Sequence, residues 1–193
     1  MKVFLFFGSF NPIHEGHIKL AEHIISPIED AFNREVWFVV SPCNPLKDKK
    51  DLLDENLRVE MLKLAIRKYK KFKICDIELS MPTPSYTIDT LNKLSELYPY
   101  NQFIPVIGTD NALIFDKWKD YKKILKNYLI DVYPRKGYDI QKAFKLYPKM
   151  RFYPRIPYYD ISSTQIREDI EKYKEWLNKD VYKYIKENHL YEK

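Results

Sequence analysis

The sequence predicts an α/β domain built on a doubly wound parallel sheet. Short apolar runs alternate along the chain with segments of helical periodicity, the order expected when helices cross over between parallel strands. The runs are continuously apolar, which is typical of strands buried on both faces. We find no repeat, low-complexity segment or linker. A single domain over residues 1–193 is therefore expected, in which the helices from about residue 168 to 193 form a small C-terminal extension.

The predicted elements alternate from the first residues onward. Buried strands are predicted at residues 3–7, 35–40, 72–79, 103–107 and 129–133, and an irregular edge segment at 151–159, where two prolines interrupt pairing. Helices are predicted at residues 18–25, 54–70, 88–98, 112–118, 121–126, 138–147, 163–176 and 181–191. Asp54 is the expected N-cap of the second helix, and Ser85 or Thr87 that of the third.

The decapeptide GSFNPIHEGH at residues 8–17 joins the first strand to the first helix. A strand, a short turn and a helix start direct backbone N–H groups and the positive end of a helix dipole at one spot, which suits a phosphate group. His14 and His17 lie three residues apart, about one helical turn. Both imidazoles can therefore face the same anion.

Three other motifs are excluded for this turn. It carries neither the three glycines of the dinucleotide fingerprint nor the Gly-Lys-Ser/Thr end of a P-loop. The histidines of a zinc protease motif lie four residues apart, whereas Glu15 here stands inside a spacing of three. The isolated His23 and His189 are interpreted as capping or surface residues.

A second phosphate contact is predicted near the end of the chain, where a helix opens after residue 161. Ser162 and Ser163 stand at its expected N-cap, where the first N–H groups lack partners within the helix. Arg167 follows within reach of the same anion. Two sites from opposite ends of the chain can thus close on one triphosphate. Since no nucleophile–base pair accompanies them, we expect direct in-line attack on the α-phosphate, with His14, His17 and Arg167 stabilising charge.

Two further predictions concern the middle of the chain and the metal. Gly108 and Asp110 follow the strand at 103–107, at an edge where ligands of open parallel sheets bind. Asp110 can accept hydrogen bonds from a ribose or cap the next helix, and Trp118 can be a stacking platform or core packing. No carboxylate cluster dedicated to a metal is visible, so Mg2+ is expected to be held mainly through nucleotide phosphates, without protein ligands.

Composition limits the partners and the location. The net charge is +6, but the lysines are scattered, which favours a solvated surface over a nucleic-acid partner. Cys43 and Cys75 form no Cys-x-x-Cys pair, so a reducing cytoplasm is expected. No apolar run approaches the ~20 residues of a membrane span, and we expect no signal peptide and no membrane partner. Formation of a homo-oligomer is left open.

The decapeptide resembles the signature of the HxGH nucleotidyltransferase superfamily, in which both histidines contact the phosphates of a nucleoside triphosphate. ISSTQIR at residues 161–167 resembles the second motif of that superfamily. Other segments are similar to bacterial nicotinate-nucleotide adenylyltransferase: SYTIDTL at 85–91, Gly108-x-Asp110 followed by Trp118, Lys47 in a proline-rich loop, and Arg58 in the next helix. The turn at 133–138 and the tail at 181–191 also fit. The resemblance spans nearly the whole chain and implies a Rossmann-like nucleotidyltransferase fold.

This resemblance also implies the ligands and the residues that hold them. ATP would be bound by His14, His17 and Arg167 together with a set of turn and helix-start residues: Gly8, Ser9, Phe10, Gly108, Asp110, Ser162, Ser163 and Thr164. Nicotinate mononucleotide would be bound by Asn11, Lys47, Thr87, Trp118 and Arg135. Trp118 would stack on the pyridine ring, and Thr87 would face its carboxylate. The products would be pyrophosphate and nicotinate adenine dinucleotide, a step in NAD biosynthesis.

One departure from the family pattern leaves the identity of the substrate that accepts the adenylyl group undecided. The bacterial family usually reads GGTFDP, whereas this chain reads GSFNP, one residue shorter and closer to eukaryotic nicotinamide-nucleotide enzymes. Nicotinamide mononucleotide is therefore an alternative acceptor. Phosphopantetheine is another, although the 85–91 segment is not expected there. A non-catalytic nucleotide- or RNA-binding protein is the alternative from a different class, suggested by the +6 charge and 16% aromatic residues and disfavoured by the scattered charge.

Overall fold

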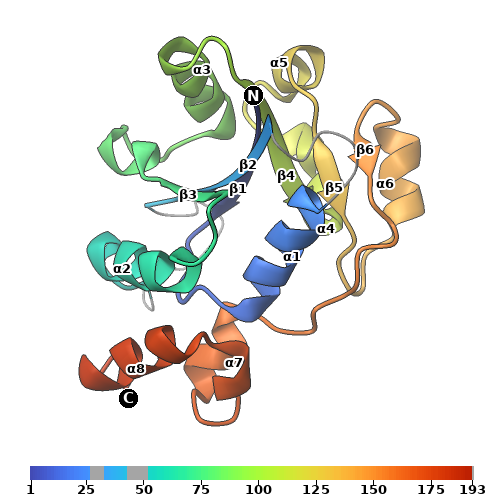
Figure 1. Ribbon diagram of the computed structural model, residues 1–193. Helices are drawn as coiled ribbons and strands as arrows, with labels where there is room; N and C mark the ends of the chain where they lie inside the picture. Colours follow the sequence, from blue (N-terminus) through green and yellow to red (C-terminus); the bar gives the residue numbers. More distant parts are fainter. Residues whose placement is uncertain (27–32, 43–51, 193) are drawn as a thin grey trace.

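The computed structural model describes residues 1–26, 33–42 and 52–192, which form an α/β fold around one parallel sheet (Figure 1). The described residues contribute six strands in the order β3-β2-β1-β4-β5-β6. Their bounds are β1 Lys2–Gly8, β2 Arg34–Val40, β3 Phe72–Cys75, β4 Gln102–Gly108, β5 Asp131–Tyr133 and β6 Arg151–Phe152. Every neighbouring pair is parallel. The predicted doubly wound parallel sheet is confirmed.

The strand order reverses at β1, which pairs with β2 on one side and β4 on the other. Such a reversal leaves a crevice beyond the carboxyl ends of the two central strands, because the connections from them run to opposite faces of the sheet. The decapeptide begins at the last residue of β1. Topology alone therefore places the decapeptide at the position where open parallel sheets bind ligands.

Helices cover both faces of the sheet (Figure 1). The α-helices are α1 Glu15–Ile25, α2 Glu55–Ile66, α3 Thr87–Leu97, α4 Thr109–Ala112, α5 Tyr121–Asn127, α6 Ile140–Leu146, α7 Ser163–Glu168 and α8 Lys179–Glu187. Short 3-10 turns lie at Ile77–Ser80, Phe115–Lys117 and Lys174–Trp176. Side chains of β1 alternate between the faces, so Phe4 and Phe6 pack with α1, α2 and α8, while Val3 and Leu5 pack with α3 and α5.

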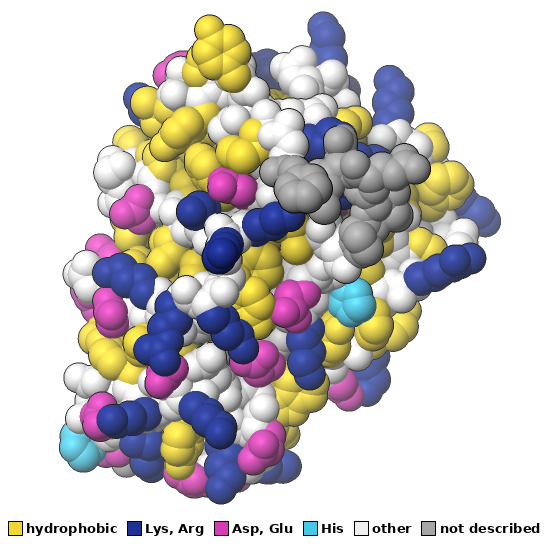
Figure 2. Space-filling view, viewed as in Figure 1, with side chains coloured by type: hydrophobic (Ala, Val, Ile, Leu, Met, Phe, Trp, Pro, Cys, Tyr) yellow, Lys and Arg dark blue, Asp and Glu magenta, His cyan; other side chains and the backbone are white. Residues whose placement is uncertain are grey.

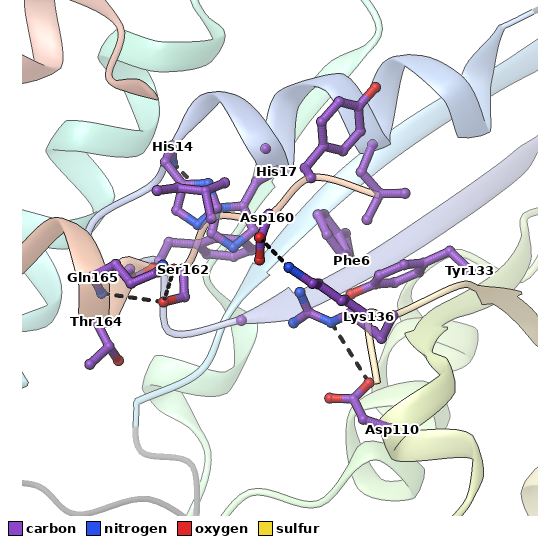
Figure 3. Close-up of a pocket in the computed structure, with 18 of the residues that line it drawn as sticks. Phe6, His14, His17, Asp110, Tyr133, Lys136, Asp160, Ser162, Thr164 and Gln165 are labelled. Atoms are coloured by element: carbon purple, nitrogen blue, oxygen red, sulfur yellow. Dashed lines mark hydrogen bonds and ion pairs between the residues drawn. The ribbon is translucent and has the colours of Figure 1, made fainter. Parts of the chain in front are cut away.

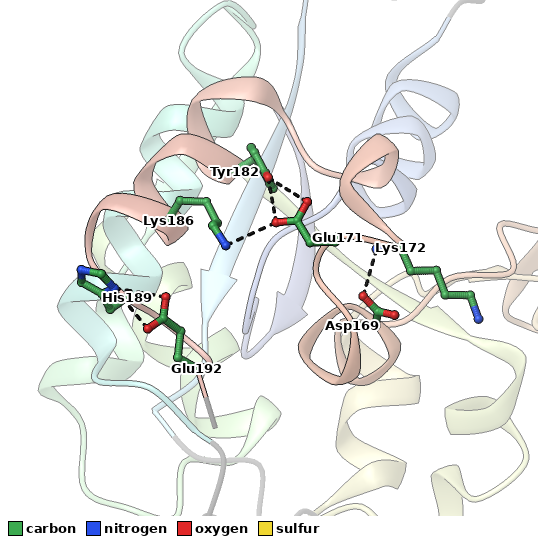
Figure 4. Close-up of polar contacts among 7 residues, drawn as sticks. All are labelled: Asp169, Glu171, Lys172, Tyr182, Lys186, His189 and Glu192. Carbon is green, nitrogen blue, oxygen red and sulfur yellow. Dashed lines mark hydrogen bonds and ion pairs between the residues drawn. The ribbon is translucent and has the colours of Figure 1, made fainter.

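Several predicted elements end earlier than expected, among them the helix predicted at 54–70, which ends at Ile66, and two of these early ends have clear local reasons. The third strand stops at Cys75, and a 3-10 turn follows in which the buried Glu78 turns inward. The helix predicted to run from 163 to about 176 ends at Glu168. There, Asp169 leaves the helical conformation (φ −153°, ψ 89°), and its carboxylate accepts a hydrogen bond from the Lys172 N–H at 3.0 Å (Figure 4). An aspartate that bonds its own following backbone offers the chain an alternative to the helix.

The C-terminal residues are part of the packed structure. Val181, Ile185 and Leu190 are buried in the same apolar cluster as α1 and α2, and α8 packs against α2. On the exposed side, Glu171 accepts hydrogen bonds from Tyr182 at 2.9 Å and pairs with Lys186 at 3.3 Å (Figure 4). Exposed ion pairs of this kind contribute little, so burial of the apolar face holds α8 in place.

The surface carries mixed charge. On the face shown in Figure 2, lysine and arginine side chains are interspersed with aspartate and glutamate. No helix within residues 1–26, 33–42 and 52–192 is both long and apolar enough to cross a bilayer.

Arg58, a residue of α2, is completely buried (0% exposed) at the carboxyl edge of the sheet. Its guanidinium donates to the carbonyl oxygens of Leu53 at 2.9 Å, Ser9 at 2.7 Å, Ser41 at 2.9 Å and Pro42 at 3.4 Å. These carbonyls belong to the turn after β1, the end of β2 and the approach to α2. One side chain therefore fixes three separate backbone segments beside the crevice.

Replacing this side chain should destabilise the fold strongly. Arg58→Leu removes a buried guanidinium and leaves several part-buried carbonyls without this donor, so we expect a loss of at least about 3 kcal/mol in the free energy of unfolding. Urea denaturation at pH 7 measures it. The matched control is Arg67→Leu, at the end of the same helix, which removes an exposed pair with Asp180 and should cost less than about 1 kcal/mol. Equal losses for the two variants would contradict the organising role of Arg58.

Candidate active site

A cavity of about 860 Å³ opens beyond the carboxyl ends of β1, β4 and β5, within the size range of ligand sites. The decapeptide and the first turn of α1 form one wall, and the start of α7 lies beside them (Figure 3). Asp110, Tyr133 and Lys136 lie across from the two histidines. Twelve of the residues predicted from the sequence line this cavity: Gly8, Ser9, Phe10, Asn11, His14, His17, Asp110, Arg135, Ser162, Ser163, Thr164 and Arg167.

His17 is oriented by the backbone of the turn. The His14 N–H donates to His17 Nδ1 at 3.3 Å. An accepting Nδ1 carries no proton, so the neutral His17 ring holds its proton on Nε2 and can act as a hydrogen-bond donor through that atom. The ring also lies edge-on to Phe6 and Phe10, with centroid distances of 5.9 and 5.4 Å. Packing and a hydrogen bond together fix both its position and its tautomer.

His14 lies against His17, with ring centroids 3.7 Å apart, and only 6% of its surface is exposed. Burial, and after it the positive charge of Arg135, lower the pKa of His14 from 6.5 to about 3. Its Nδ1 is buried and has no hydrogen-bond partner in the described part of the chain. A buried polar atom without a partner is costly, and this one faces the first turn of α1, where the His14 side chain stands in a capping box with the backbone of His17.

Gly16 allows the two predicted phosphate motifs to meet. A Cβ at this position would lie 2.7 Å from Ile161 Cγ2 and 3.0 Å from His14 Nδ1. Any larger residue would therefore push the start of α7 away from the first turn of α1. The glycine between the histidines is explained by this close approach.

Side chains of α7 bind the decapeptide directly. Ser163 Oγ donates to the Pro12 carbonyl at 2.9 Å, and Arg167 Nη1 donates to the Asn11 carbonyl at 2.8 Å. Ser162 is the N-cap of α7, and its Oγ accepts from the Gln165 N–H at 3.2 Å. Residues more than 150 positions apart along the sequence are thereby joined into one wall.

The cavity wall across from the decapeptide carries paired basic and acidic side chains. Arg135 Nε lies 3.8 Å from Asp110 Oδ1, and its guanidinium lies over the Tyr133 ring at 5.6 Å. Lys136 Nζ contacts Asp160 at 2.5 Å. Gly108 does not line the cavity, but a Cβ there would lie 2.3 Å from Asp110 Oδ1 and 2.9 Å from Arg135 Cγ. The glycine therefore makes room for the Asp110–Arg135 pair.

Three other predicted residues lie outside the cavity lining or outside the described residues. Thr87 is the first residue of α3 and does not line the cavity. Trp118 is half-buried and packs on Phe115, with centroids 4.9 Å apart, on the other face of the sheet. Lys47 lies outside the described residues. Phe10 lines the cavity but is 2% exposed and has a positive φ of 49°, so its ring belongs largely to the core.

Glu78 is an important residue that sequence reasoning missed. It is 3% exposed, and its carboxylate accepts hydrogen bonds from Ser85 Oγ at 2.9 Å and Thr90 Oγ1 at 2.7 Å. These bonds fix the loop before α3, and Tyr86 rather than Ser85 or Thr87 is the N-cap. The only sequence signal is an acidic residue in the apolar stretch IELS. Lys136 and Asp160 were also missed as cavity residues.

The residues described by the structure contain no group of three or more His, Cys, Asp or Glu side chains arranged to hold a metal ion. The carboxylates in the lining, Asp110 and Asp160, each contact a cation.

The parallel sheet, the histidine-bearing turn after β1 and the facing α7 define a nucleotidyltransferase of the HxGH type. The family described as cytidylyltransferase-like matches residues 5–169. The protein named "probable nicotinate-nucleotide adenylyltransferase" of Porphyromonas gingivalis is 44% identical over 178 residues, covering 90% of this chain and 87% of that protein. The protein of the same name from Flavobacterium johnsoniae is 42% identical over 197 residues and covers 100% of both chains. This chain therefore belongs to the nicotinate-nucleotide adenylyltransferase family, as its motifs predicted.

Solved structures support the fold independently. The Plasmodium falciparum nicotinic acid mononucleotide adenylyltransferase complexed with NaAD superposes with a TM-score of 0.77 at 22% identity, covering 98% of this chain and 97% of that one. The structure named "putative nicotinate-nucleotide adenylyltransferase" from Vibrio parahaemolyticus superposes on this chain with a TM-score of 0.71. The Rossmann-like nucleotidyltransferase fold is thereby confirmed.

The neutral state of His14 in the free protein can be tested by titration. Since its pKa lies below 6.5 in the folded chain, protonation favours the unfolded state. The associated stability is fully present above about pH 6.5 and is lost as the pH falls toward about 3, by up to about 1.4 kcal/mol per pH unit. NMR titration of the imidazole Cε1–H should find His14 neutral at pH 5. A midpoint near 6.5 would show that the ring is not desolvated.

Proposed function

We propose that this protein transfers the adenylyl group of ATP to nicotinate mononucleotide, releasing pyrophosphate and forming nicotinate adenine dinucleotide. One observation carries the proposal: His14, His17 and Arg167 share one cavity at the strand-order reversal, although they come from opposite ends of the chain. The family to which the chain belongs supports the same reaction. The role in NAD synthesis follows from this product.

In the proposed complex, the triphosphate lies between the decapeptide and α7. His17 donates from Nε2, and the His14 ring lies beside it. Arg167 adds a fixed positive charge, already oriented by its bond to the Asn11 carbonyl at 2.8 Å. Gly8, Ser9, Phe10, Gly108, Asp110, Ser162, Ser163 and Thr164 complete the proposed ATP site, in which Asp110 faces the ribose.

The proposed step is a direct displacement. A phosphate oxygen of nicotinate mononucleotide attacks the α-phosphorus of ATP, and the bond from that phosphorus to the bridging oxygen breaks. Pyrophosphate leaves with the electron pair. Charge builds on the phosphate oxygens in the transition state, so groups already held in place, such as Arg167 and the His17 ring, stabilise it without reorganising.

Magnesium is assigned to the nucleotide in this proposal. The lining carboxylates Asp110 and Asp160 already contact Arg135 and Lys136, which fits an ion held chiefly by phosphate oxygens. When bound, Mg2+ supplies neutralisation of the triphosphate charge.

The acceptor side is assigned to Asn11, Lys47, Thr87, Trp118 and Arg135. The start of α3 supports a carboxylate subsite, because Tyr86 caps it without a side-chain hydrogen bond and the loop before it is fixed through Glu78. Trp118 supplies an aromatic face for the pyridine ring. A cytoplasmic location and self-association remain predictions from the sequence.

A pyrophosphate-release assay with ATP and three acceptors tests the assignment. We expect nicotinate mononucleotide to give the highest kcat/KM, with nicotinamide mononucleotide lower and phosphopantetheine inactive. A higher kcat/KM with nicotinamide mononucleotide would instead identify the protein as a nicotinamide-nucleotide adenylyltransferase. Absence of pyrophosphate release with every acceptor, despite ATP binding, would support a non-catalytic nucleotide-binding protein instead.

His17→Ala should reduce kcat by roughly 100-fold, because it removes a donor that acts on charge developing in the transition state. The KM for ATP should change much less. Steady-state kinetics with both substrates varied measures this, and thermal unfolding checks that the fold is retained. A variant with normal kcat would exclude His17 from transition-state stabilisation.

A further inference from the structure

The last residues of the chain adopt a specific conformation after α8. His189 and Tyr191 have positive φ angles of 50° and 63°, which non-glycine residues rarely adopt. Between them, Leu190 is buried, and its N–H donates to the Ile185 carbonyl at 3.0 Å. Because these backbone conformations cost free energy, the contacts that they permit must offset it.

The left-handed turn directs Tyr191 toward the decapeptide. Its hydroxyl donates to Asn11 Oδ1 at 2.8 Å, a contact across 180 residues of sequence. Burial raises the pKa of Tyr191, although the charges of Arg167 and Arg58 act in the opposite direction. The hydroxyl therefore stays protonated and remains a donor at neutral pH.

Asn11 is where these contacts converge. It is 3% exposed and lines the cavity. Its Oδ1 also accepts from the Leu53 N–H at 3.3 Å, and its carbonyl accepts from Arg167 Nη1 at 2.8 Å. Tyr191 and Arg167 thus bind the same residue, one through the side chain and the other through the backbone.

We propose that Tyr191 is a positioning residue for nucleotide binding, which acts by holding Asn11 and, through its carbonyl, the Arg167 guanidinium. The inference rests on the proposed function to the extent that the ligand is ATP. The decapeptide is then held in its binding conformation by the docked C-terminus, and no contact between Tyr191 and ATP is required.

The test compares two tyrosines of the same C-terminal segment. Tyr191→Phe removes the hydroxyl and keeps the ring. Tyr182→Phe is the matched control, because it also removes one tyrosine hydroxyl, but that hydroxyl bonds Glu171 on the exposed side of the extension. Isothermal titration calorimetry with ATP and Mg2+, without acceptor, measures the Kd of the wild type and both variants. Turnover and thermal midpoints are recorded in parallel.

We expect Tyr191→Phe to weaken ATP binding about five- to tenfold, as for loss of one buried hydrogen bond, and Tyr182→Phe to stay within about twofold of wild type. ATP affinity within twofold of wild type in Tyr191→Phe, with or without a lower thermal midpoint, would overturn the inference, as would equal losses in both variants. Wild-type protein that binds ATP but does not turn over nicotinate mononucleotide would refute the proposed function alone. Failure of the wild type to bind ATP would refute both.

Discussion

The turn that leaves β1 depends on side chains from distant parts of the chain. Arg58 binds the Ser9 carbonyl from α2, and Arg167 binds the Asn11 carbonyl from α7. Tyr191 reaches Asn11 from beyond α8. A turn lies outside the regular hydrogen-bond pattern of a strand or helix, so donors from other segments help to fix its conformation. The site therefore exists only when the whole chain has folded.

This arrangement has a chemical consequence at the histidines. The same packing that fixes the turn buries His14 and keeps it neutral, while the backbone sets the tautomer of His17. A neutral His14 ring avoids the cost of burying charge before a ligand arrives. A bound polyanion changes that balance, because its negative charge favours positive and donating groups beside it. Preorganised donors of this kind suit catalysis by charge stabilisation.

The sequence predicted the sheet and the meeting of its two motifs, but it missed the buried polar contacts that hold the loops around them. The continuous apolar runs predicted the sheet, and the spacing of His14 and His17 predicted a turn at which both rings lie together. Burial of Arg58 and Glu78 could not be predicted, because a charged residue in a helix or loop has the same local pattern whether it faces solvent or distant carbonyls and hydroxyls. Trp118 is assigned to the acceptor site by resemblance, and its half-buried packing beside Phe115 depends on tertiary contacts that sequence does not give.

The central claim is that residues from both ends of the chain bind one triphosphate. The most direct measurement is a crystal structure of the protein with Mg2+ and the non-hydrolysable analogue α,β-methylene-ATP. The account predicts phosphate oxygens within hydrogen-bond distance of His17 Nε2 and of the Arg167 guanidinium in the same molecule. Phosphates bound away from either group, or outside the cavity between the decapeptide and α7, would contradict it.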